Sequence, residues 1–183
     1  QMRHPEDKMI FEMSKDVSRL RIIAERFSKI GSVPDLQLVS LNETVLTAVN
    51  YITNRTSDKV KIQCHFPDKN HIFIKLNVPL FEWVIENLCK NAIDAMDGSG
   101  KIYINISKND KECYIDVKDT GKGIERKKFK TIFNPGFTTK SRGWGLGLSL
   151  AKRIVEEYHE GKIFVKSSEL NIGTTFRIIL KAI

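Results

Sequence analysis

The sequence has few cysteines, and they form no pattern typical of a cross-link or a metal site. Its 183 residues include three, Cys64, Cys89 and Cys113, which lie far apart and form no C-x-x-C pair. A disulfide framework needs an even set and a zinc site needs closely spaced ligands, so we expect neither. A domain of this length buries about 70% of the surface that its unfolded chain exposes and needs no such cross-links. The cysteine content therefore favours a reducing, cytoplasmic setting.

Long apolar runs and a signal-peptide pattern are also missing. No stretch reaches the 18 or more apolar residues typical of a membrane-spanning helix, so we expect this stretch neither to span nor to enter a membrane. The chain begins with Gln1, which leads us to expect a longer parent protein, with any membrane anchor upstream. Acidic residues number 22 against 30 Lys and Arg, a net charge of +8. Because the cations are spread along the chain, we interpret them as a solvated surface and expect no nucleic-acid partner.

The two common phosphate-binding motifs are absent as well. There is no G-x-x-x-x-G-K-[ST] loop and no G-x-G-x-x-G of a Rossmann unit. Two glycine clusters are present instead, in 119–124 and 143–147. The first follows an alternating run that predicts a half-buried strand, and the second leads into an apolar stripe at helical spacing. Glycines allow close approach of a ligand and a helix N-terminus attracts an anion, so one nucleotide could satisfy both clusters. Taken alone, each cluster is better interpreted as an ordinary tight turn.

A long helix is predicted near the start of the chain, from Glu6 to Ile30. It contains no Gly or Pro, and Gly31 and Pro34 end it. Its apolar residues repeat at alternating spacings of three and four, which calls for a partner helix. They are Ile10, Met13, Val17, Leu20, Ala24 and Phe27. The partner helices are expected upstream and on a second chain, although packing on its own domain is the alternative. Residues 32–39 are expected to form an extended linker, which divides the chain into domains 1–39 and 40–183.

The rest of the chain predicts helices inserted among strands. A capping box, Ser40-Leu-Asn-Glu43, opens a helix that extends to about Asn54. A second helix is expected from about Leu80 to Met96, with Pro79 in its first turn. Alternating runs predict strands at 60–66, 71–77, 101–107, 112–118, 162–168 and 174–180. Short turn sequences join them as hairpins, so the expected fold class is α+β, one mostly antiparallel sheet with helices on one face.

Three polar side chains form a stripe on the helix predicted at 80–96. Asn87, Asn91 and Asp94 stand at i, i+4 and i+7, beside the apolar face. Such groups are costly there unless they meet something polar. Amide oxygens suit a Mg²⁺ ion that is already bound to phosphates. Caps on neighbouring backbone are the alternative, and the helix alone does not decide between them.

Several segments, in this order, resemble the sequence boxes of sensor histidine kinases of two-component systems, members of the GHKL ATPase superfamily. They are 87–92 (N box), 119–124 (G1), 133 with 137–140 (F), 143–148 (G2) and 173–176 (final strand). The resemblance covers roughly residues 40–183 and implies a Bergerat-type ATP-binding fold, a two-layer α/β sandwich. The helix at 6–30 resembles the second helix of the dimerisation and histidine-phosphotransfer domain, which implies a homodimer in the full-length protein.

The resemblance also implies a site for ATP and Mg²⁺. Asn91 would ligate Mg²⁺, Asn87 would lie against the phosphates, and Asp119 would accept a hydrogen bond from the adenine 6-amino group. Residues 133–142 would form a mobile lid. The positions assigned to ATP are Asn87, Lys90, Asn91, Asp94, Asp119, Gly121, Gly123, Ile124, Phe133, Thr138, Thr139, Lys140, Arg142, Gly143, Gly145, Leu146, Gly147, Leu148 and Thr174.

The sequence departs from the family pattern in three places. Trp144 stands where the family usually has a small hydroxyl residue, and its ring is expected to pack the lid against the core. Asp94 and Ala95 replace a Lys and a Tyr, which removes one phosphate contact and one adenine-stacking wall. The short lid resembles that of the nitrogen-regulatory branch.

The phosphate acceptor of the family, a histidine followed by an acid and a proline, has no counterpart here. His4, His65, His71 and His159 lack that pattern and are interpreted as structural or surface residues. The chain is therefore expected to bind ATP without phosphorylating itself, and no catalytic residue is assigned to it. The implied partner is the receiver domain of a response regulator, and the implied location is the cytoplasmic part of a membrane-bound sensor. A GHKL-type ATPase or serine kinase, or a non-catalytic module that binds a partner through 6–30, is the alternative.

Overall fold

The computed structural model describes residues 35–66, 72–139 and 144–182. The chain divides into two compact units, 1–34 and 35–183, and the second is described here. The helix predicted at 6–30, and nearly all of the segment 1–39 that the sequence assigns to a separate domain, lie outside the described residues.

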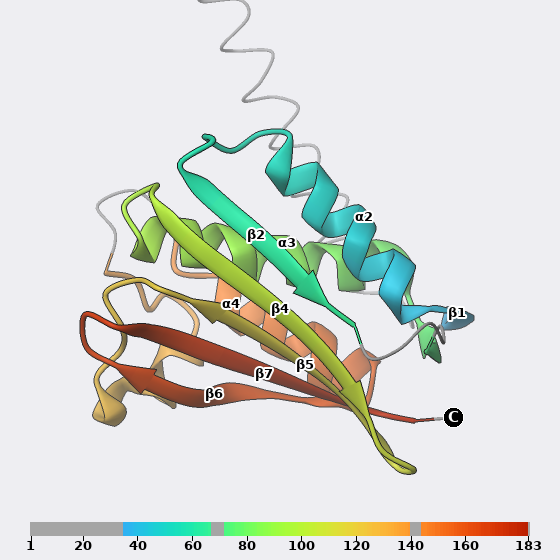
Figure 1. The fold of residues 1–183 in the computed structure, drawn as a ribbon. Helices are drawn as coiled ribbons and strands as arrows, with labels where there is room; N and C mark the ends of the chain where they lie inside the picture. The colour runs from blue at the N-terminus through green and yellow to red at the C-terminus, as the bar shows by residue number, and fades with distance from the viewer. Residues whose placement is uncertain (1–34, 67–71, 140–143, 183) are drawn as a thin grey trace, which may run out of the picture. The chain divides into compact units, whose positions relative to one another are not determined.

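A five-stranded mixed sheet forms one layer (Figure 1). Its strand order is β2-β4-β5-β7-β6, and only β2 and β4 run parallel. The strands are β2 (Val60–His65), β4 (Gly100–Lys108), β5 (Glu112–Asp119), β6 (Lys162–Glu169) and β7 (Gly173–Lys181). The two hairpins predicted in the second half of the chain, β4–β5 and β6–β7, are confirmed. So is the predicted fold class, a two-layer α+β sandwich with a mostly antiparallel sheet.

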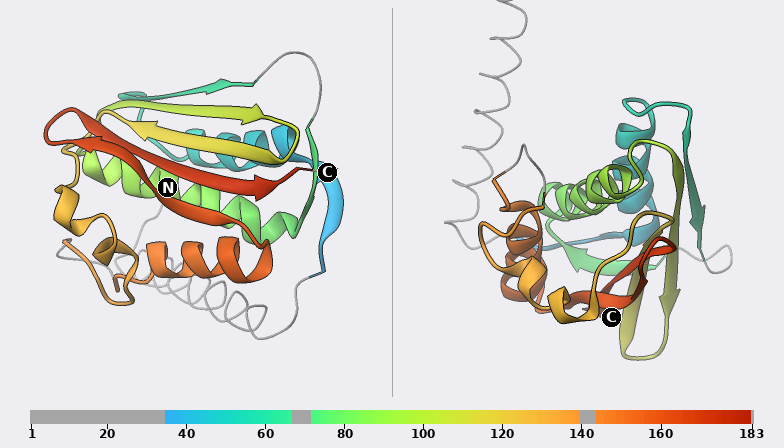
Figure 2. Two further views of the ribbon diagram at one scale, coloured as in Figure 1. Left: turned by 90° about the horizontal axis from the view of Figure 1, so that it is seen from below. Right: turned by 90° about the vertical axis from the view of Figure 1, so that its left-hand side faces the viewer.

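The helices cover one face of this sheet (Figure 2). They are α2 (Leu41–Thr53), α3 (Val78–Ala95) and α4 (Gly147–Arg153), which continues as a π-helical turn, η3 (Ile154–Tyr158). Alternate residues of the strands are buried beneath them, for example Ile102, Ile104 and Ile106 of β4. The core between sheet and helices is mostly aliphatic. Its residues therefore recur in the sequence with the hydrophobic period of 2 for strands and 3.6 for helices, and these periods allowed the elements to be predicted.

Two capping side chains fix where the helices begin. Ser40 Oγ accepts a hydrogen bond from the Glu43 N–H at 3.3 Å, as the capping box predicts. Asn77 Oδ1 accepts one from the Leu80 N–H at 3.2 Å, and Pro79 lies in the first turn of α3. Each bond satisfies one of the N–H groups that a helix start leaves unpaired. The caps hold the first turns of α2 and α3 in place above the sheet.

Two expectations about the first half of the unit were wrong. The predicted linker contains a strand, β1 (Gln37–Ser40), which pairs with β3 (Phe73–Leu76) in a separate two-stranded sheet. The predicted strands 60–66 and 71–77 therefore do not pair with each other, since β2 pairs with β4 instead. Burial explains why β3 pairs with β1. Ile74 and Leu76 of β3 are buried in the core, and β1 supplies hydrogen-bond partners for the β3 backbone there.

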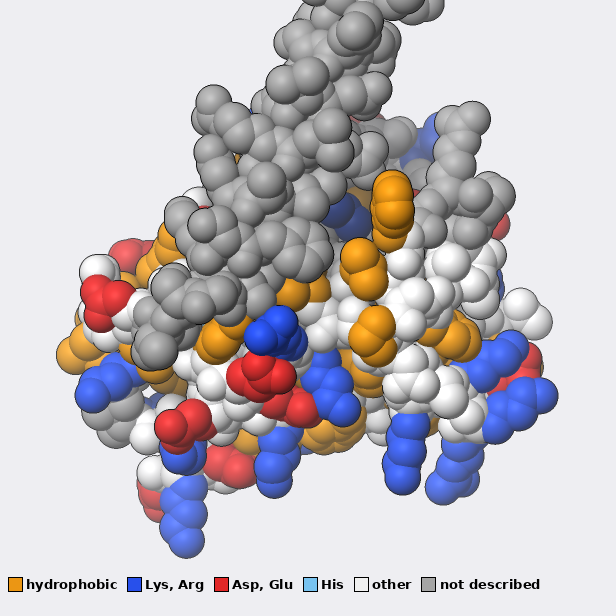
Figure 3. All heavy atoms as spheres, turned by 180° about the vertical axis from the view of Figure 1, so that it is seen from behind, with side chains coloured by type: hydrophobic (Ala, Val, Ile, Leu, Met, Phe, Trp, Pro, Cys, Tyr) orange, Lys and Arg blue, Asp and Glu red, His pale blue; other side chains and the backbone are white. Residues whose placement is uncertain are grey.

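Charged side chains are distributed over the helix-bearing face. Lys and Arg stand apart from one another, and several adjoin Asp or Glu (Figure 3). Some pairs lie within single turns, such as Arg153 with Glu157 at 2.9 Å and Lys128 with Glu125 at 2.6 Å. Exposed pairs of this kind contribute little to stability.

Candidate functional site

A buried carboxylate ends strand β5. Asp119 is 3% exposed and lies on the helix-facing side of the sheet. Its Oδ1 accepts two backbone hydrogen bonds, from Gly121 at 2.8 Å and from Thr174 at 3.2 Å. Burial raises the pKa of this carboxyl above its usual value, and the N–H donors partly oppose the rise. A buried acceptor held in a fixed direction is suited to recognising a donor on a ligand.

The loop after Asp119 is packed too closely for side chains. A Cβ at Gly121 would lie 2.5 Å from the carbonyl oxygen of Ala95, and the Lys122 N–H donates to the same oxygen at 2.9 Å. Gly123 has a φ of +73°, and a Cβ there would overlap with the backbone of Glu169. The first glycine cluster thus joins the end of α3 to the β6–β7 turn.

The start of β7 packs against Asp119 from the neighbouring strand. Thr174, 3% exposed, lies opposite Asp119 and donates its N–H to that carboxylate. Gly173 touches the Asp119 carbonyl so closely that a Cβ would overlap with it. Ser168 of β6 accepts the Ile124 N–H at 2.8 Å and lies 2.9 Å from the Thr174 hydroxyl.

The sequence assigned neither Ser168 nor Gly173 to the site. A glycine before a strand was a usable signal for Gly173, whereas nothing in the sequence marks Ser168.

The polar stripe of α3 meets the start of α4. Among the described side chains, Asn87 supplies the fully buried polar atom that has no hydrogen-bond partner, its Nδ2. A Cβ at Gly147, the first residue of α4, would overlap with Asn87 Oδ1. Asn91 is half-buried and Asp94 is exposed along the same stripe. The structure therefore brings Asn87 and Gly147 together, as a shared site requires.

The segment between the glycine clusters is partly anchored. It contains two short 3₁₀ turns, η1 (Arg126–Lys128) and η2 (Thr131–Phe133). Phe133 is buried edge-on against Phe176, with ring centroids 6.2 Å apart, so in this structure it packs in the core. The Gly136 N–H donates to the Gly145 carbonyl at 3.1 Å, which ties the second glycine cluster to this segment.

The structure does not bring several of the residues that the sequence assigned to ATP together with Asp119 and Asn87. Lys90 pairs with Glu86 at 3.2 Å and lies over the Tyr51 ring of α2, on another side of α3. Trp144 is 87% exposed, so the expectation that its ring packs the lid against the core was wrong. Thr138 and Thr139 are also exposed, and Leu146 is exposed just before α4, whereas Leu148 packs against the core. Lys140, Arg142 and Gly143 lie outside the described residues.

Comparison with known families decides the class of this site. Residues 76–182 match the family described as "Histidine kinase-, DNA gyrase B-, and HSP90-like ATPase". That match covers α3, α4, the site and most of the sheet. The chain belongs to this family.

Histidine kinases are prominent among its relatives. The chain is 32% identical to sporulation kinase C of Bacillus subtilis over 144 residues, 79% of this chain and 33% of that protein. It is 33% identical to the sensor histidine kinase ZraS of Escherichia coli over 171 residues, 92% of this chain and 36% of that protein. It thus spans about a third of these relatives. The catalytic domain of histidine kinase ThkA superposes with a TM-score of 0.73 at 27% identity, covering 81% of this chain and 96% of that one. Within this family, the chain is therefore similar to the catalytic domains of sensor histidine kinases.

The described part of the chain contains two histidines, His65 and His159. His159 is buried; its Nε2 accepts the Asn77 N–H at 3.1 Å, so its Nδ1 carries the proton and donates to the Ile154 carbonyl at 2.9 Å. Burial lowers the pKa of His159 below its usual value. His65 is exposed on β2. His4 and His71 lie outside the described residues. In the described part of the chain, no helix is long and apolar enough to cross a membrane.

Proposed function

We propose that the chain binds Mg-ATP and presents the γ-phosphate to a histidine on a dimerisation helix outside this sequence. The phosphoryl group would then pass to an aspartate in the receiver domain of a response regulator. Family membership supports ATP as the ligand. One solved relative, histidine kinase ThkA, is described in complex with the response regulator TrrA, which supports this class of partner. Homodimerisation through 6–30, a cytoplasmic location and the absence of a nucleic-acid partner remain predictions.

The observation that carries this proposal is the contact between Asn87 and Gly147. Asn87 Nδ2 is a buried donor without an acceptor, a state that costs about 1–3 kcal/mol. It lies where α4 begins, and a helix start offers free N–H groups and a positive dipole end. A phosphate oxygen would supply the missing acceptor. The residues present therefore fit an anionic ligand at this end of the site.

The carboxylate of Asp119 fits the other end of the ligand. A charge-assisted hydrogen bond from an exocyclic amino group contributes about 1.5–3 kcal/mol. Adenine carries an amino group at C6, whereas guanine carries a carbonyl that the carboxylate would repel. Gly121, Gly123 and Gly173 let the backbone around this carboxylate pack closely, against Ala95, Glu169 and Asp119 itself, which holds the carboxylate in a fixed position. We therefore propose that Asp119 selects adenine.

The metal would be held through Asn91. Across 35–66, 72–139 and 144–182, no group of three or more His, Cys, Asp or Glu side chains could form a metal cage. Mg²⁺ commonly takes one or two protein ligands and completes its shell with phosphates and water, so an amide oxygen beside the phosphate end suits it. When bound, the ion neutralises phosphate charge. Asn91, half-buried one turn along α3 from Asn87, would supply that oxygen.

Substitution of Asn91 tests the proposed function. Asn91→Ala removes the metal ligand, so the dissociation constant for Mg-ATP should rise by at least about tenfold, equivalent to about 1.4 kcal/mol. Isothermal titration calorimetry measures this, with and without Mg²⁺. Asn105→Ala is the matched control, because Asn105 is an exposed asparagine on the far face of β4. Equal affinities in wild type and Asn91→Ala would contradict the role of Asn91, and no binding by the wild type would contradict the function.

Two other functions are less well supported. An ATPase needs a base that takes a proton from water, and an amide such as Asn87 cannot act as one. A module that binds a partner without nucleotide would not need a buried, unpartnered donor beside Gly147. A null result with ATP in calorimetry would favour the second alternative.

A further inference from the structure

A β-bulge in strand β6 changes which side chains face the site. Val165 pairs with Phe176, yet Ser167, only two residues on, pairs with the adjacent Thr175. Lys166 is the extra residue. Side chains alternate between the two faces of a strand, so an added residue reverses the alternation beyond it. Ser168, opposite Thr174, therefore takes the helix-facing side, and Ser167 takes the outer side.

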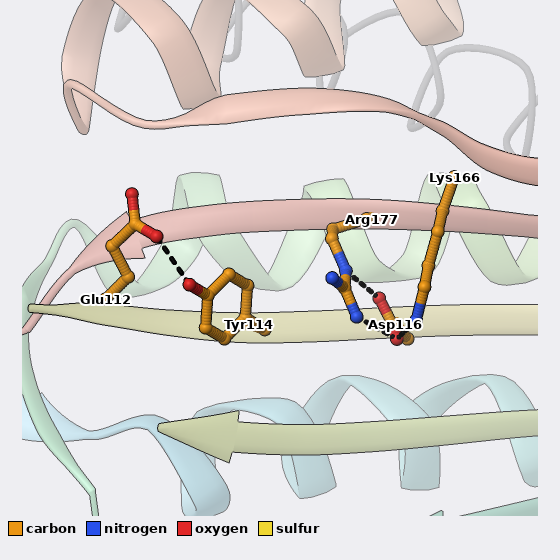
Figure 4. A network of polar contacts seen from close by, with 5 residues as sticks. All are labelled: Glu112, Tyr114, Asp116, Lys166 and Arg177. Carbon is orange, nitrogen blue, oxygen red and sulfur yellow. Dashed lines mark hydrogen bonds and ion pairs between the residues drawn. The ribbon is translucent and has the colours of Figure 1, made fainter. Parts of the chain in front are cut away.

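An ion network holds the bulge on the outer face of the sheet. Lys166 Nζ donates to Asp116 Oδ2 at 2.8 Å, and Arg177 makes two parallel bonds to the same carboxylate at 2.6 and 2.7 Å (Figure 4). Asp116 lies on β5 and Arg177 on β7, so the carboxylate connects three neighbouring strands. A bidentate guanidinium fixes the geometry of its partner. The extra residue is thus fastened on the face opposite the site.

On the inner face, the Ser168 hydroxyl makes three contacts. It accepts the Ile124 N–H at 2.8 Å, donates to the Gly173 carbonyl at 3.0 Å and lies 2.9 Å from Thr174 Oγ1. A carbonyl can only accept, so the single proton of Ser168 is used there. The contact with Thr174 must then use the proton of Thr174. The Thr174 oxygen can then only accept further hydrogen bonds, because its single proton is already donated to Ser168.

We propose that Ser168 is a positioning and specificity residue of the nucleotide site, an inference that rests on the proposed function. Ser168 ties the loop after Asp119, through Ile124, to the strand that carries Thr174. It also keeps the Thr174 hydroxyl from donating. The wall formed by Asp119 and Thr174 then offers only side-chain acceptors, which suits the 6-amino group of adenine and disfavours a 6-oxo purine.

Removal of the hydroxyl should therefore change selectivity as well as affinity. In Ser168→Ala the Thr174 proton is released and can turn toward the ligand. ATP binding should weaken by about 3–10-fold, the equivalent of one neutral hydrogen bond. The preference for ATP over inosine triphosphate should fall by at least about threefold. Ser168→Thr, which keeps a hydroxyl, should retain both values, and Ser167→Ala is the matched control on the outer face.

Calorimetry with ATP and inosine triphosphate on these variants tests the inference, together with amide hydrogen exchange of the nucleotide-free protein. The Ile124 amide should exchange at least about tenfold faster in Ser168→Ala than in Ser167→Ala. The inference would be overturned if Ser168→Ala and Ser167→Ala showed the same preference for ATP over inosine triphosphate and the same exchange rate of the Ile124 amide. A wild type without ATP affinity would overturn the proposed function and the specificity role with it, while the exchange rates would still decide whether Ser168 orders the loop.

Discussion

At the scale of single residues, two buried polar atoms define the candidate site. Asp119 Oδ1 is held by two backbone donors, and Asn87 Nδ2 is left without an acceptor. In the proposed function, the first would accept a hydrogen bond from an amino group and the second would donate one to an anion. The sequence predicted both residues from their boxes. It could not predict Ser168, because the bulge that re-aims this side chain leaves no mark on the alternation of a short strand.

His159 is a second residue-scale feature, with a consequence for pH dependence. Burial lowers the pKa of the folded imidazole below 6.5, and its Nε2 is occupied as an acceptor of the Asn77 N–H. As pH falls below about 6.5, the unfolded chain binds a proton that the folded one resists. Stability is therefore present above pH 6.5 and lost below it, by up to about 1.4 kcal/mol per pH unit.

Urea unfolding between pH 7.5 and 5.5 measures this loss. His159→Gln should flatten the pH dependence, whatever its effect on stability at pH 7.5. His65→Gln, which alters an exposed histidine, should leave the slope of the wild type unchanged. A wild-type slope in His159→Gln would show that another group is responsible.

At the scale of elements, the Asp116 network ties the bulge of β6 to β5 and β7. Asp116→Ala removes the carboxylate, whose side chain is 14% exposed, and leaves the guanidinium of Arg177, 24% exposed, unpaired. The free energy of unfolding should fall by about 1–2 kcal/mol, a charge-assisted pair discounted for its partial exposure. Chemical denaturation measures it. Glu160→Ala, which removes the exposed partner of Lys181, should have little effect; equal losses in both variants would contradict the special role of the bulge.

The same scale shows why some elements were predictable and others were not. The helices and the β4–β5 and β6–β7 hairpins follow from periodicity, caps and turns, all of which are local signals. β1 was missed because four residues carry too short a pattern and its partner, β3, lies more than thirty residues away. β2 was given the wrong partner because its pairing with β4 spans the whole of α3. Non-local pairing has no signature in neighbouring residues.

At the scale of the whole molecule, the proposed function gives the nucleotide site to the described unit and the phosphate acceptor to a segment outside this sequence. Incubation with labelled ATP should leave no phosphohistidine on this chain, since none of its four histidines has the sequence pattern of the family's acceptor and, in the described residues, His159 is buried and bonded. A separately supplied dimerisation domain of the parent protein should become labelled, and Asn91→Ala should reduce that labelling. Acid-labile label on this chain alone would contradict the prediction.

The position of β7 has a consequence for synthesis. It is the last strand in sequence, yet it lies between β5 and β6. Until residues 173–181 leave the ribosome, β5 lacks its inner neighbour and β6 has no strand beside it. Asp119 then lacks the Thr174 donor. The proposed nucleotide site can therefore assemble only after β7 has been synthesised, and nascent chains that stop before Gly173 should be handled by the cell as unfinished, aggregation-prone intermediates.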